Sequence, residues 1–101
     1  MGLTISLISE NGNVHDSITD ERNSLHKILP APDDASYCCL RFIDWYGDTV
    51  FNRIQMETVL DELERITQGH QAEDATLIST IKKLAMRCLS EPHLYLKFCG
   101  D

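Results

Sequence analysis

Two carboxylates flank a glycine near the middle of the chain. Asp44, Gly47, Asp48 and Asn52 form the pattern D-x-x-G-D-x-x-x-N. Carboxylate and amide oxygens are the ligands that Ca²⁺ and Mg²⁺ prefer, so the pattern allows a metal site. It lacks the spacing and the closing glutamate of an EF-hand loop, and Asp and Gly are also ordinary turn residues. We expect a turn, and the alternative is a metal- or small-molecule-binding site at residues 44–52, with enzymatic activity left open.

Other catalytic arrangements have little support in the sequence. A thiol nucleophile would need a cysteine near His26 or His93, yet no glycine-rich oxyanion turn occurs in the sequence. The cysteines also lack the CxxC or CxxH spacing of a zinc site. We expect no catalytic residue, no bound metal and no cofactor. We expect reduced, buried thiols at four positions: Cys38, Cys39, Cys88 and Cys99.

A row of carboxylates in a predicted helix is a candidate for binding. Glu57, Asp61 and Glu64 recur at i, i+4 and i+7 and therefore share one solvent-facing stripe, with Glu62 adjacent. The simplest interpretation is a solvated helix face. The functional interpretation is an acidic patch for a positively charged partner.

The adjacent aromatic residues Trp45 and Tyr46 extend this binding hypothesis. Both fall in the predicted turn, and the tip of a turn is hard to bury, so they are candidate interface anchors. The alternative is that Trp45 folds back onto the core. The predicted partner-binding residues are Trp45, Tyr46, Asp44, Asp48, Glu57, Asp61 and Glu64.

Charge and composition restrict the kind of partner. The chain has 101 residues and a net charge of −7, and its nine basic residues are scattered. Nucleic acids and anionic membranes are bound through clustered Lys and Arg, so neither is an expected partner, whereas a basic protein is. No apolar run approaches the roughly 20 residues of a membrane span, and the N-terminus lacks a basic signal-peptide region. We expect a single cytoplasmic domain over residues 1–101.

Hydrophobic periodicity predicts the elements that position these residues. Alternating apolar residues indicate strands, and Asn11-Gly12 predicts a hairpin between the first two. Asp16 and Asp20 are turn or N-cap candidates, and Asn52 is a cap candidate for the first long helix. The predicted elements are strands at residues 3–9 and 14–18, a short helix at 24–29, a hairpin of strands at 38–43 and 49–52, helices at 54–68 and 72–89, and a strand at 93–99.

This order predicts an α+β fold: a mostly antiparallel sheet with a helical hairpin packed on one face. Residues 3–7, 38–43 and 94–98 should lie in one sheet. The last strand should insert beside the first strand or the central hairpin. An unpaired edge strand can pair with itself, so a homodimer is a further alternative.

Two segments resemble known proteins. Residues 40–52 and 93–101 are similar to those of small, acidic, single-domain bacterial proteins of unassigned function, some of which resemble immunity proteins of toxin systems. The resemblance implies a binding role and no catalysis. The most specific function that this resemblance implies is that of a cytosolic inhibitor that covers the active site of a cognate basic toxin, such as a nuclease.

Overall fold

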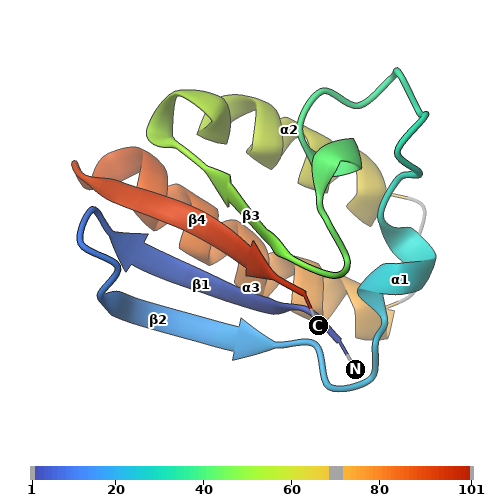
Figure 1. The fold of residues 1–101 in the computed structure, drawn as a ribbon. Helices are drawn as coiled ribbons and strands as arrows, with labels where there is room; N and C mark the ends of the chain where they lie inside the picture. The colour runs from blue at the N-terminus through green and yellow to red at the C-terminus, as the bar shows by residue number, and fades with distance from the viewer. Residues whose placement is uncertain (1, 69–71, 101) are drawn as a thin grey trace.

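The computed structural model describes residues 2–68 and 72–100. Within them, a four-stranded antiparallel sheet has the strand order β2-β1-β4-β3, and the helices pack against it (Figure 1). The predicted α+β class is therefore confirmed. The strands are β1 (Thr4–Ser9), β2 (Val14–Thr19), β3 (Asp48–Phe51) and β4 (Leu94–Cys99). The helices are α1 (Leu25–Ile28), α2 (Met56–Thr67) and α3 (Ala72–Ser90), with 3-10 turns η1 (Leu40–Phe42) and η2 (Arg53–Gln55).

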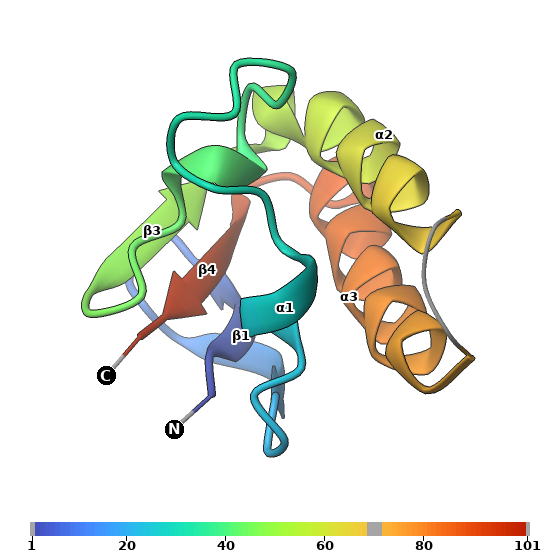
Figure 2. The same ribbon diagram turned by 90° about the vertical axis from the view of Figure 1, so that its right-hand side faces the viewer.

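One face of the sheet is buried under α2 and α3, which form a second layer (Figure 2). Along β4, buried side chains alternate with half-buried ones. Ile5 of β1 is paired with Phe98, and Leu7 with Leu96, so both central strands turn their apolar residues toward the helices. The last strand lies between β1 and β3, which confirms its predicted insertion beside the first strand.

Two of the three cap candidates, Asn52 and Asp20, accept hydrogen bonds from N–H groups at a helix start, whereas the prediction for Asp16 is wrong because this residue lies within β2. The Asn52 side chain accepts a hydrogen bond from the Gln55 backbone N–H, and the Gln55 side chain accepts one from the Asn52 N–H, which makes a capping box ahead of α2. The buried carboxylate of Asp20 accepts hydrogen bonds from the N–H groups of Ser24 and Leu25, at 3.0 and 2.8 Å. The predicted helix end at Gly69 lies outside the described residues.

The predicted strand at residues 38–43 is wrong. This segment makes the turn η1, and β3 pairs with β4 alone. Its backbone is drawn inward because the N–H groups of Cys38, Cys39 and Leu40 all donate to the carboxylate of Glu62 on α2. The bonds from Cys39 and Leu40 to Oε1 are 3.2 and 2.9 Å long. Successive N–H groups of this kind form an anion-binding concavity, and a strand cannot present them to one acceptor.

Glu62 has surroundings different from those of the acidic stripe next to it. It is only 2% exposed, whereas the carboxylates of the stripe face solvent. A carboxylate that deep must be hydrogen-bonded to remain stable there, and the three amides meet that need.

All four cysteines are free thiols, as expected, but the prediction that all are buried is wrong: Cys39 and Cys88 are buried, Cys99 is half-buried and Cys38 is exposed.

Replacing Glu62 with Gln should destabilise the protein by about 2–4 kcal/mol, because the amide loses the charge and turns an N–H₂ donor toward backbone N–H groups. Urea denaturation monitored by circular dichroism measures the free energy of unfolding. The matched control is Glu57→Gln, an exposed glutamate on the same helix, which should change it by no more than about 0.5 kcal/mol. Equal effects of the two substitutions would show that the buried contact contributes little.

Candidate partner-binding surface

The turn at residues 44–48 is held by its own polar groups. The Asp44 carboxylate accepts a hydrogen bond from the Tyr46 N–H at 2.9 Å, and the Asp44 N–H donates to the Thr49 hydroxyl at 2.8 Å. The Gly47 carbonyl accepts from the Gly100 N–H at 2.7 Å. Gly100 has little room, since a Cβ there would lie 2.3 Å from the Trp45 carbonyl oxygen. The turn is therefore fixed both internally and against the end of β4.

The two aromatic residues of this turn have different surroundings. Trp45 is half-buried, packs against the hydrophobic core and makes an edge contact with the His26 ring, with 5.1 Å between ring centroids. Tyr46 is 85% exposed. Trp45 thus follows the alternative in which the indole folds back onto the core, and Tyr46 alone extends into solvent.

The oxygen donors of the proposed metal pattern are engaged elsewhere. Asp44 caps the turn, and Asn52 caps the helix start. The Asp48 carboxylate lies 3.4 Å from the Lys97 ammonium on β4. In residues 2–68 and 72–100, no three His, Cys, Asp or Glu side chains gather where they could hold a metal ion. The geometry gives these three side chains structural roles.

Asp48 illustrates such a role on the open side of the sheet. The pKa of the Asp48 carboxyl lies below its ordinary value of 3.8, chiefly because of a hydrogen bond from the Cys99 thiol and next because of one from the Lys97 ammonium. Its Cα partner across the β3–β4 ladder is Cys99. The ionised form is thus favoured in the folded protein.

Because the folded-state pKa of Asp48 is lowered, its contribution to stability is complete well above pH 3.8 and is lost as the pH falls through the folded value. Asp48→Asn should therefore be less stable than the parent protein at pH 6–7, with a difference that shrinks below about pH 4 and disappears in stronger acid. Urea titrations across this range measure it. A difference independent of pH would contradict the assigned cause.

The acidic stripe on α2 is exposed, as predicted. Glu57, Asp61 and Glu64 all face solvent, but Glu64 forms an ion pair with Lys82 of α3. Among the described residues, no ion pair involves Glu57 or Asp61. In the described part of the chain, the stripe therefore presents two exposed carboxylates, one turn apart, that form no ion pair.

The predicted binding residues do not form one surface. In Figure 2 the loop that leads into β3, which includes the 44–48 turn, lies on the sheet side, whereas α2 lies in the opposite layer. A rigid partner of ordinary interface size would contact one of these regions. The aromatic turn and the acidic stripe are thus separate candidates.

The sequence interpretation missed a residue that lies beside the acidic stripe. Ile54 in η2 is 88% exposed, more than any other large apolar side chain that the structure describes. It borders a surface hollow of about 290 Å³ that is lined by Arg53, Ile54, Glu57 and Leu89. A signal was present, because Ile54 falls outside the buried stripe of α2, which begins at Met56. An apolar residue off that stripe must face solvent.

A second hollow, of about 370 Å³, lies next to Ile54 at the ends of several strands and turns. Arg53, which borders both hollows, is tethered by a 2.9 Å hydrogen bond from its Nε to the Leu89 carbonyl. Glu10 and His93 are 2.6 Å apart at the rim. The lining residues are Glu10, Asn52, Arg53, Ile54, His93, Leu94 and Tyr95. The exposed Ile54 side chain thus borders both hollows.

Comparison with known protein families, curated proteins and solved structures finds no match to this chain. Function is therefore inferred from its own surface. In the described part of the chain, no helix is long and apolar enough to cross a membrane.

Trp45→Ala should lower the free energy of unfolding by about 2 kcal/mol, less than the roughly 3–5 kcal/mol typical of a fully buried aromatic residue. Tyr46→Ala, next to it, should change it by no more than about 0.5 kcal/mol. Thermal and urea denaturation of both variants measure this. Equal effects would mean that the indole does not pack against the core in solution.

Proposed function

We propose that this protein is a non-enzymatic binding module of the immunity type, which neutralises a basic protein toxin by covering its active site. The observation that carries the proposal is the exposure of two carboxylates on α2, Glu57 and Asp61, together with the 88% exposed Ile54, which lies beside Glu57 just before the helix. The net charge of −7 and the resemblance of residues 40–52 and 93–101 to immunity-type proteins support it.

Each part of this surface has a physical role in the proposal. Exposed carboxylates attract a basic partner and speed its approach, although each contributes little to the final affinity. Ile54 supplies what charges do not: burying an isoleucine side chain is worth roughly 1.5–3 kcal/mol. The hollows on either side of Ile54 accept side chains of the partner. The proposed interface anchor is therefore Ile54, and not Trp45, which was the anchor predicted from the sequence.

The choice of α2 over the 44–48 turn follows from the contacts. Asp44 and Asp48 are occupied by the turn and by Lys97, and Trp45 is packed on the core. Glu57 and Asp61 have no such engagement among the described residues, so their charge is available to a partner. An inhibitor that blocks a site needs no catalytic group of its own.

The test is to capture a partner from extracts of the organism that encodes the protein and to measure association and dissociation rates. Glu57→Lys/Asp61→Lys should slow association about tenfold and weaken its salt dependence, because exposed charges act mainly on encounter. Ile54→Ala should leave association nearly unchanged and speed dissociation about tenfold or more, as expected for an interface anchor. The partner should be basic and should lose its activity in the complex.

The matched controls are an exposed carboxylate and an exposed apolar residue elsewhere. Asp33→Lys lies in the loop before η1, and Val50→Ala lies on β3, where the side chain is 48% exposed. Neither should change either rate by more than about twofold. If the controls act like the α2 variants, or if binding depends on Asp44 and Tyr46 instead, the α2 surface is not the interface.

A further inference from the structure

The strand β2 forms one edge of the sheet and is open on its outer side. Among the described strands it pairs only with β1, and all its side chains are exposed except that of Ile18, which is half-buried. In an antiparallel pair, alternate residues direct their backbone groups toward and away from the partner. Asp20 just beyond β2 donates its N–H to the Leu3 carbonyl, so Ile18 faces β1 and Ser17 faces outward. The Ser17 N–H is thus a free-edge donor.

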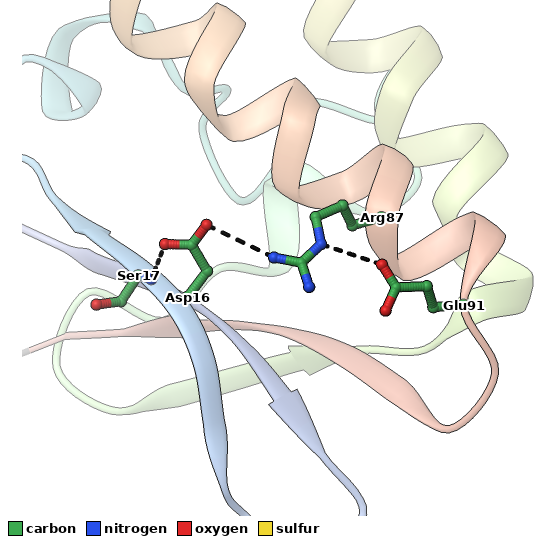
Figure 3. Close-up of polar contacts among 4 residues, drawn as sticks. All are labelled: Asp16, Ser17, Arg87 and Glu91. Carbon is green, nitrogen blue, oxygen red and sulfur yellow. Dashed lines mark hydrogen bonds and ion pairs between the residues drawn. The ribbon is translucent and has the colours of Figure 1, made fainter.

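This outward donor is occupied by a side chain of the same strand. The Asp16 carboxylate accepts a hydrogen bond from the Ser17 N–H at 2.9 Å, and its other oxygen lies 3.7 Å from Nη1 of Arg87 on α3. Arg87 in turn contacts Glu91 through Nε, at 3.1 Å. Figure 3 shows the three charged groups in a row from the sheet edge to the helix. Arg87 therefore holds the Asp16 carboxylate beside the Ser17 N–H.

A second irregularity lies at the same place. The register between β1 and β2 shifts after Leu7, which is paired with Asp16, while Ile8 is paired with Val14. Residue 15 is therefore unpaired, as in a β-bulge. Bulges and charged side chains on an edge are the features by which sheets avoid pairing with other chains. In β2 the bulge lies at residue 15 and the charged side chain is that of Asp16, so both features are close to Ser17.

We infer that Asp16 masks the β2 edge, and that the surface under this mask fits the β2 strand of a second copy. An antiparallel pair of identical strands is closed by a two-fold axis, so the same residue can be its own partner. With the axis at Ser17, the N–H of each copy would donate to the carbonyl of the other. That N–H is the group that Asp16 occupies in the single chain. The protein is therefore a monomer, and removing the mask should allow a dimer.

This inference is independent of the proposed function, because β2 and α2 lie at different parts of the molecule (Figure 1). The two also respond oppositely to salt. Binding of a basic partner weakens as salt screens the attraction. Pairing of two chains that each carry −7 strengthens, because the same screening reduces their repulsion.

The experiment is sedimentation equilibrium of the full chain and of Asp16→Ala over a range of concentrations and salt. The parent should remain monomeric at every concentration. Asp16→Ala should form a dimer whose dissociation constant lies about tenfold or more below the highest concentration used, and this constant should fall further with added salt. Asp33→Ala, which removes an exposed aspartate away from any strand, should stay monomeric.

A second substitution decides whether β2 is the contact. Adding Ser17→Pro to Asp16→Ala removes the outward N–H without removing a bond to β1, so the double variant should return to a monomer. Circular dichroism verifies that both variants are folded. A monomeric, folded Asp16→Ala, a parent that is already dimeric, or a dimer that survives Ser17→Pro would each overturn the inference.

Discussion

The carboxylate of Glu62 determines how the segment before β3 reaches the sheet. It is buried between α2 and the turn η1, where three consecutive backbone N–H groups donate to it. Without such an acceptor the amides of Cys39 and Leu40 would be buried and unpaired, at a cost of roughly 1–3 kcal/mol each. The η1 turn also places Leu40 and Ile43 in the core and leads the chain to the start of β3. One side chain thus connects the helical layer to the edge of the sheet.

This arrangement gives α2 two different sides. Its inner side carries Glu62 together with the apolar residues that contact the core, and its outer side carries Glu57 and Asp61. Since the inner contacts hold the helix rigidly, the outer carboxylates are presented on a fixed backbone. A surface of this kind pays little ordering entropy when it meets a partner, which favours recognition by rigid docking.

The sequence predicted most of the fold because the apolar period was regular. The alternation in β1 and β4 and the helical period from Met56 to Ile66 each had one consistent interpretation. The conformation of residues 38–43 could not be predicted in this way, because it depends on a contact with Glu62, more than 20 residues later in the chain. The position of Glu62 itself was readable: it lies three residues after Val59 and four before Ile66, on the buried side of the helix. Its acidic neighbours masked that signal.

The candidate surface was harder to predict for a related reason. Periodicity placed Glu57, Asp61 and Glu64 on the outside, but only the packing of α3 shows that Lys82 compensates one of them. Likewise, the burial of Trp45 depends on His26 and the core, which no local pattern encodes. Sequence spacing gives the direction of a side chain, whereas its partners depend on how distant elements meet.

The strand order also affects how the chain is made and folded. The two central strands, β1 and β4, are the first and last of the described chain, and their register joins Thr4 to Cys99. The middle of the sheet therefore closes the longest loop available, which is costly in entropy and slow to form. During synthesis the β1–β2 hairpin emerges well before β4, and its apolar face remains uncovered by that strand until β4 has been made. The nascent chain is therefore exposed to misassembly until β4 emerges, and chaperones that hold apolar strands would act in that interval.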